Sequence, residues 1–158
     1  MPGPGWRCGC GPPKIEDVRS LKWSSEQAVH VPEIDTEHQE MFRLAADFRE
    51  AVLAGEKPAR LALRCRRLAA EMNGHLSHEE RLMREAGYPA LAWHERQHRT
   101  VRARLGALER DVERGERQPI FEALEAVAGW LRDHTSVADR MAGAYLRNYW
   151  RERNCVST

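Results

Sequence analysis

Long hydrophobic runs are absent from this chain of 158 residues, although 42% of its residues are hydrophobic. No stretch is long enough for a membrane span or for the core of a signal peptide, so we expect a cytoplasmic protein without a membrane partner. An excess of either charge is also lacking, because 25 basic residues face 24 acidic ones. The arginines alternate with glutamates, which is typical of solvated helix faces, and we therefore expect no nucleic-acid partner.

Cysteines are few, and their spacing does not indicate a disulfide-rich domain. Cys65 lies on an apolar helix face, where we expect a small buried side chain. Cys8 and Cys10 lie in a Gly/Pro-rich segment, and Cys155 lies near the C-terminus. Two thiols are too few for a closed structural zinc site, and a reducing cytosol favours thiols over disulfides. A bridge between the two ends of the chain, or metal binding by Cys8 and Cys10, stays an alternative.

Hydrophobic residues recur at three- and four-residue steps in four segments, which is the period of an amphipathic helix. Proline and glycine place these segments at residues 32–55, 58–87, 89–115 and 119–145. The inward positions of the last segment end with Ala138, Met141 and Tyr145. Four such helices pack most economically as an all-α, up-down-up-down antiparallel four-helix bundle. We expect a flexible arm over residues 1–20, the bundle over residues 21–146 and a polar tail over residues 147–158, in a monomer or weak homo-oligomer.

Histidines and carboxylates occupy inward positions on all four expected helices. Residues four apart share one face of a helix, so His75 points the same way as Glu79, and His94 the same way as His98. Any one of these histidines alone would more often be an ordinary core residue than a metal ligand. Their joint alignment favours the metal site. The full inward set is His38, His75, Glu79, His94, His98, His134 and Asp139.

The number and type of these side chains indicate which metal site they would form. Five imidazoles and two carboxylates are too many for one tetrahedral zinc ion. They suit two octahedral ions that share bridging carboxylates, and mixed nitrogen and oxygen ligands suit iron. Asp139 lies five residues after His134, about 140° round a regular helix, so we expect these two side chains to flank a gap. A carboxylate in that position could bridge to a second metal ion.

At these positions the sequence resembles the hemerythrin family, in particular the single-domain bacteriohemerythrins. The resemblance covers residues 21–146 and rests on Trp23, Ile34-Asp35, His38, His75, Glu79-Glu80, Met83, Gly87-Tyr88-Pro89, His94, His98, Trp130-Leu131, His134 and Asp139. It implies two non-haem iron ions joined by a hydroxo or oxo bridge. One iron would be held by His94, His98 and His134, the other by His38 and His75, with Glu79 and Asp139 bridging both. The second iron would keep an open position for dioxygen.

The resemblance also implies which side chains line the dioxygen pocket, namely Trp130, Thr135 and Leu76. Trp130 would either shield the metal ions or serve packing alone. The family usually has a bulky apolar residue where this chain has Thr135, and an aromatic residue where it has Leu76. We expect the Thr135 hydroxyl to face the pocket, where it would hydrogen-bond the bound ligand or admit water.

Three further polar residues lie near the expected ligands in sequence but outside their register. His30 and His78 do not share the inward face, and we expect both at the surface or its boundary. Glu80 follows the ligand Glu79 directly, so its side chain is turned aside. We expect it to be solvated or to contact a ligand from outside.

The implied function is reversible binding of dioxygen for storage, transport or scavenging, without a catalytic residue. An imidazole-rich shell favours carriage, because diiron bundles that generate strong oxidants use more carboxylates. One alternative is a diiron enzyme that acts on peroxide or nitric oxide or repairs iron–sulfur centres, which Thr135 favours. Another is an oxygen or redox sensor that acts on a separate partner through Cys8, Cys10 or the C-terminal tail.

Overall fold

The structure is a computed structural model, and it describes residues 21–156. The expected arm over residues 1–20, with Cys8 and Cys10, lies outside the described residues. Every regular element in the described range is helical. In chain order these are η2 (Ser25–Gln27), α1 (Pro32–Leu53), α2 (Pro58–Ala86), α3 (Leu91–Arg114), α4 (Arg117–His134), η3 (Thr135–Asp139) and α5 (Arg140–Val156). None of the helices in this range is long and apolar enough to cross a membrane.

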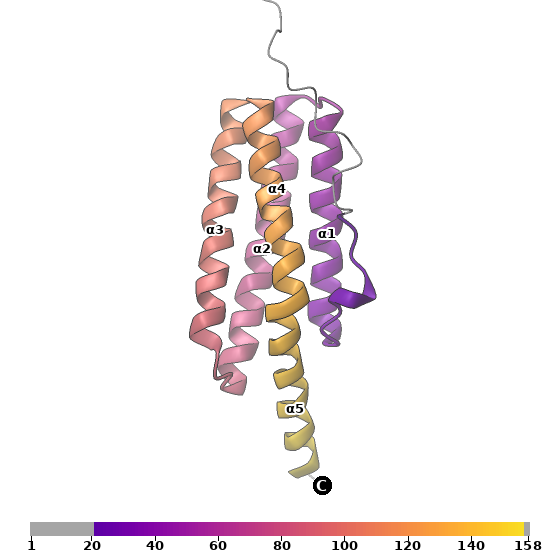
Figure 1. The fold of residues 1–158 in the computed structure, drawn as a ribbon, viewed down its shortest axis with the longest axis vertical. Helices are drawn as coiled ribbons and strands as arrows, with labels where there is room; N and C mark the ends of the chain where they lie inside the picture. Colours follow the sequence, from indigo (N-terminus) through magenta and orange to yellow (C-terminus); the bar gives the residue numbers. More distant parts are fainter. Residues whose placement is uncertain (1–20, 157–158) are drawn as a thin grey trace, which may run out of the picture.

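Helices α1 to α4 form a four-helix bundle (Figure 1). Each helix contacts the next one along the chain, and α4 also contacts α1, which closes the ring. Helix α5 continues the line of α4 and extends past the ends of α2 and α3 (Figure 1). Residues 147–156, for which the sequence predicted only a polar tail, therefore belong to a long helix.

Proline begins α1 and α2, and glycine follows α2 and α3, as the sequence predicted. Pro32 and Pro58 are the first residues of α1 and α2, where the fixed φ of proline suits a helix start. Gly87 and Gly115 follow α2 and α3 with φ angles of 68° and 74°, in the left-handed region that favours glycine. These residues confirm the expected limits, whereas α4 begins at Arg117, two residues before the expected Pro119.

The polar residues of the expected site form a layer between apolar clusters. The main core fills one side with side chains such as Phe42, Phe48 and Leu124, all of them completely buried. Two smaller clusters, built around Ile34 and Met83, lie on the other side. Each large apolar side chain buried here contributes roughly 1.5–3 kcal/mol to folding. The polar layer is therefore enclosed by the hydrophobic core on both sides.

The fourth helix departs from the expected regular α-helix at η3, which is a π-helical turn. A π-turn accommodates one extra residue and rotates everything that follows relative to a regular helix. The prediction that Met141 faces inward is wrong for this reason, whereas Tyr145 is partly buried and packs against the cluster around Met83. Met141 is 56% exposed, whereas the next residue along, Ala142, is fully buried, and Leu146 is 1% exposed. The inward register shifts by one residue at η3.

The segment before α1 crosses α5 at close range. The Asp35 carboxylate fixes this segment by accepting hydrogen bonds from the backbone N–H groups of Val29 at 2.8 Å and His30 at 2.9 Å. Gly143 makes the crossing possible, because a Cβ atom there would lie 2.8 Å from both the side chain and the carbonyl oxygen of Val29. Trp150 of α5 packs against the same segment.

Candidate metal centre

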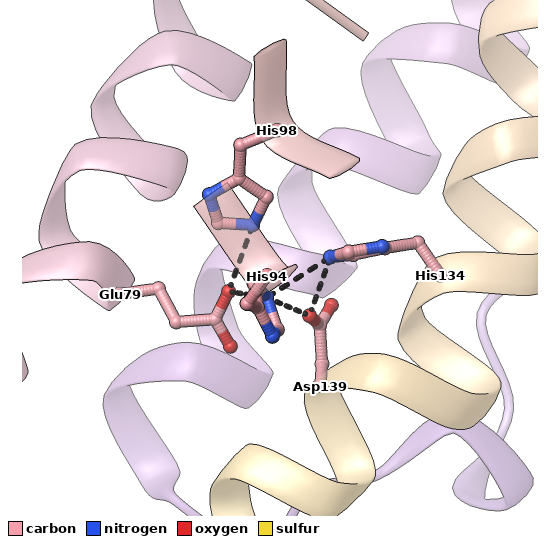
Figure 2. A group of neighbouring side chains, drawn as sticks. All are labelled: Glu79, His94, His98, His134 and Asp139. Atoms are coloured by element: carbon pink, nitrogen blue, oxygen red, sulfur yellow. Dashed lines mark hydrogen bonds and ion pairs between the residues drawn. The ribbon is translucent and has the colours of Figure 1, made fainter. Parts of the chain in front are cut away.

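Five buried side chains from three helices and η3 converge in one group, which we call the five-residue group (Figure 2). Its members are Glu79, His94, His98, His134 and Asp139. The His94 Nε2 atom lies 3.1 Å from an oxygen of Glu79 and 3.2 Å from Oδ1 of Asp139. The Nε2 atom of His98 lies 3.3 Å from the same Glu79 oxygen. These atoms face one another in the middle of the bundle.

A second group consists of His38, His75 and Asp139, and we call it the three-residue group. The His38 Nε2 atom lies 3.1 Å from Oδ2 of Asp139. The Nε2 atom of His75 lies 3.9 Å from Glu79 Oε2. Asp139 therefore belongs to both groups, with Oδ1 facing one and Oδ2 facing the other.

The π-turn η3 places Asp139 on the same side of the chain as His134. The His134 Nε2 atom lies 3.0 Å from Oδ1 of Asp139, so the expectation that the two side chains flank a gap is wrong. A regular α-helix would separate them by about 140°, and the wider π-turn removes most of that angle. Two hydroxyl groups stabilise the turn, because Thr135 and Ser136 both donate to carbonyl oxygens of the preceding turn.

Burial and the facing imidazoles act in opposite directions on the carboxyl groups. Burial, with Asp139 nearby, raises the pKa of Glu79, but the imidazoles of His94 and His98 outweigh this and lower it to about 2. Burial likewise raises the pKa of Asp139, yet His134 and its neighbours bring it well below the usual range. Burial lowers the pKa of His94, whereas the two carboxylates raise it to about 9. Both carboxylates thus stay ionised at neutral pH, as ligands of a cation must be.

The arrangement fits a bound cation better than it fits hydrogen bonding within the protein. Among the described residues, both ring nitrogens of His38, Nε2 of His98 and both oxygens of Asp139 are buried without a hydrogen-bond partner. Most of these atoms lie close to opposite charges but make no well-oriented hydrogen bond, and buried polar groups without one cost several kcal/mol in total. Neighbouring donors on one octahedral ion, each about 2.1 Å from it, would lie about 3 Å apart. The Nε2 atoms of His94 and His134 lie 3.1 Å apart, which matches that separation.

Two of the expected pocket residues lie at this layer in different ways. Leu76 is 1% exposed and belongs to the main core. Thr135 is also 1% exposed, but its hydroxyl donates to the carbonyl oxygen of Leu131 at 2.9 Å. The proton of that hydroxyl is therefore directed to the helix backbone. It is not directed toward either group.

Trp130 stacks on His134, with ring centroids 4.1 Å apart and an angle of 16° between the planes. Trp93 meets His94 edge-on, with centroids 6.2 Å apart. Both tryptophans line a surface hollow of about 450 Å³ that also reaches His134. His134 is 6% exposed, the highest fraction among the seven side chains of the two groups. The five-residue group approaches the surface at this hollow.

Two carboxylates outside the groups contact histidines within them. Glu80 Oε1 accepts a hydrogen bond from Nδ1 of His98 at 2.8 Å, in agreement with the expectation that it touches a ligand from outside. Glu37 does the same for Nδ1 of His75 at 2.8 Å, a contact that was not predicted from the sequence. The only sequence feature that could have indicated this contact is the position of Glu37 directly before His38. That feature is weak, because the Glu37 side chain contacts a histidine on a neighbouring helix. His78 belongs to neither group but contacts Glu37, and His30 is exposed.

Comparison with known families agrees with this geometry. The family model of the hemerythrin HHE cation-binding domain matches residues 29–146, a range that contains all seven side chains of both groups. A search of the curated proteins found no match. The matched range covers most of the chain and every helix of the bundle. This chain belongs to the hemerythrin family of cation-binding domains.

Proposed function

We propose that the protein binds dioxygen reversibly at a non-haem diiron centre, for storage, transport or scavenging. The observation that carries this proposal is the position of Asp139, which faces one group of donors with each of its two carboxylate oxygens. A carboxylate in that position suits two adjacent metal ions. Iron ions held there in the reduced state would supply the two electrons that dioxygen takes up on binding.

The donor types support iron over the other common metals. Thiolate ligands, which structural zinc sites favour, are absent from both groups. Magnesium and calcium favour sites built from oxygen donors, whereas five of the seven side chains here are imidazoles. Mixed imidazole and carboxylate ligands suit iron. We propose that the seven side chains hold two iron ions joined by a hydroxo or oxo bridge.

The two groups differ in the number of protein donors, which supports a division of roles. The five-residue group would fill most positions of an octahedral ion from the protein alone, whereas the three-residue group leaves more positions open. The apolar clusters around Ile34 and Met83 exclude water on one side of the layer, and the main core excludes it on the other. Exclusion of water slows the side reactions that would oxidise the site irreversibly.

Thr135 is the one residue that favoured the enzyme alternative in the sequence, and its hydrogen bonds do not support that role. Its hydroxyl donates to backbone carbonyls of α4, which leaves no proton for a ligand at the metal site. No other residue of the described range offers a specific argument for catalysis. We therefore propose carriage.

We also infer an up-down-up-down order for the bundle. The links at residues 54–57, 87–90 and 115–116 are short, and each joins two helices that contact each other. A short link between contacting helices favours antiparallel neighbours. In that order all four helices bring their site residues to one level of the bundle.

A cycle of oxygenation tests the proposed function. The protein is loaded with ferrous iron without air, air is admitted, and argon then removes it. We expect a visible charge-transfer band that appears with air and vanishes under argon over several cycles. A band that forms once and does not reverse would contradict carriage. His98→Ala should abolish the band, whereas His30→Ala, which changes an exposed histidine outside both groups, should preserve it.

A further inference from the structure

Each of the two groups contains one histidine whose outer ring nitrogen contacts a carboxylate from another helix. In the three-residue group, Nδ1 of His75 on α2 lies 2.8 Å from Oε2 of Glu37 on α1. In the five-residue group, Nδ1 of His98 on α3 lies 2.8 Å from Oε1 of Glu80 on α2. The two contacts repeat the same arrangement at the two halves of the site. Neither carboxylate belongs to a group itself.

Each carboxylate is also held by a second, nitrogen-bearing side chain nearer the surface. Glu37 uses its other oxygen, Oε1, to contact Nδ1 of His78 at 2.6 Å. Glu80 accepts from the guanidinium of Arg102 at 2.7 Å. The side chains of Glu37 and Glu80 are 25% and 16% exposed, so both contacts are partly shielded from water. The two carboxylates are therefore fixed from both sides.

The contact at Nδ1 decides what the opposite nitrogen can do. A ring that donates its Nδ1 proton to a carboxylate carries its lone pair on Nε2, which is the atom that faces the metal position. The carboxylate also fixes the rotation of the ring and makes Nε2 a stronger base. By contrast, Nδ1 of His38 and Nδ1 of His94 have no hydrogen-bond partner among the described residues. His75 and His98 thus have an outer support that these two rings lack.

We propose that Glu37 and Glu80 are positioning residues of the metal centre, Glu37 for the ion of the three-residue group and Glu80 for the ion of the five-residue group. This inference rests on the proposed two-ion site but not on dioxygen binding. Loss of such an outer partner typically lowers metal affinity about 10- to 100-fold. Because each carboxylate serves one group, each substitution should weaken one ion and spare the other.

The test uses Co²⁺ as the probe and compares matched glutamate substitutions. Glu37→Ala and Glu80→Ala remove the two contacts. Glu40→Ala on α1 and Glu85→Ala on α2 are controls, because those glutamates pair only with surface arginines in the described structure. The measurement is the rate at which Co²⁺ leaves the loaded protein in the presence of a chelator. We expect the unmodified protein to release Co²⁺ in two phases of equal amplitude, one for each ion. In each test variant one phase should be about 10- to 100-fold faster, and in the controls neither phase should be faster.

A second readout separates positioning from a general loss of structure. In the Co²⁺-loaded protein, the paramagnetic ion shifts the NMR signals of the ring N–H protons of its histidine ligands far from the other proton signals. Removing Glu37 should speed solvent exchange of the His75 ring proton alone, and removing Glu80 that of the His98 ring proton alone. Glu37→Gln and Glu80→Gln keep an acceptor oxygen without the charge and should give intermediate effects in both readouts.

The outcomes distinguish this inference from the proposed function. If the unmodified protein binds two Co²⁺ ions and both test variants release them no faster than the controls, the inference is wrong. Equal acceleration of both phases in one variant would also contradict it, because each carboxylate would then not serve one ion. A protein that shows the expected Co²⁺ behaviour but no reversible oxygen band with iron would keep the inference and refute carriage.

Discussion

Replacing Asp139 by asparagine is the substitution that most sharply separates two metal positions from one. Asparagine has nearly the same shape as aspartate, so Asp139→Asn creates no cavity although the Asp139 side chain is only 1% exposed. The three-residue group loses its only carboxylate and keeps two imidazoles. The five-residue group keeps Glu79 and its three imidazoles, which are four donors. We therefore expect the variant to retain one ion and to lose the other.

The size of the effect follows from the linkage between metal binding and stability. An ion present at 100 times its Kd stabilises the folded protein by about 2.7 kcal/mol, so two ions contribute about 5 kcal/mol. For a domain of this size 1 kcal/mol corresponds to roughly 2–4 °C in Tm. The unmodified protein should therefore gain about 10–20 °C on saturation with metal, and Asp139→Asn about half of that.

The assay is thermal unfolding followed by circular dichroism, with and without saturating Fe²⁺ under argon. Each protein serves as its own reference, so a change in the stability of the unloaded variant does not affect the comparison. Asp133→Asn is the matched control, because Asp133 is exposed and lies outside both groups. It should keep the full gain. An equal gain for Asp139→Asn and the unmodified protein would refute the bridging position of this carboxylate.

Three further predictions concern the scaffold. Gly143→Ala should lower the free energy of unfolding by about 1–3 kcal/mol, because its Cβ would meet backbone at 2.8 Å. A Cβ atom at Gly74 would have no neighbour within 4 Å, so Gly74→Ala should raise the free energy of unfolding by about 0.5–1 kcal/mol. Urea titration measures both changes, and a change of the same sign in both variants would contradict the close crossing at Gly143. Thr135→Val should cost about 1 kcal/mol by removing the hydroxyl bond to Leu131, and no loss would show that this bond does not support the π-turn. Burial raises the pKa of Cys65 from 9.0 to about 12, so the folded protein keeps the thiol protonated at pH values where the unfolded chain loses that proton. The contribution of Cys65 to the free energy of unfolding should therefore be complete below pH 9 and decline above it. Peptide mapping should find Cys65 unlabelled by iodoacetamide at pH 8 in the folded protein, and rapid labelling would contradict its burial.

Much of the bundle is predictable because its signals are local. The prolines that open α1 and α2 and the glycines that follow α2 and α3 act through their own φ angles, without help from distant residues. The pairs His75 with Glu79 and His94 with His98 need only the four-residue repeat of a helix. These local rules led to a list of seven side chains, and the structure brings all seven together in two groups that share Asp139.

The π-turn could not be read from the hydrophobic period. Periodicity assumes a constant angle per residue, and one additional residue at η3 moves both Asp139 and every later inward position. That single departure explains two errors: the angle expected between His134 and Asp139, and the inward placement of Met141. Adjacent hydroxyls at Thr135 and Ser136 were a usable signal, because both cap carbonyls of the preceding turn.

Contacts between helices were the other missing part. Glu37 reaches His75 only because α1 and α2 have a particular rotation and axial offset, which side-chain packing along their whole length determines. A single sequence carries no direct signal for that offset. Glu80 was easier to anticipate, since it directly follows a residue of the five-residue group.

The number of metal ions bound per chain tests the central claim most directly. Native mass spectrometry of the protein loaded with Fe²⁺ under argon reports that number without reference to dioxygen. Two groups that share one carboxylate predict two ions per chain in the unmodified protein and one in Asp139→Asn. A single ion in the unmodified protein, or none, would contradict the paired site.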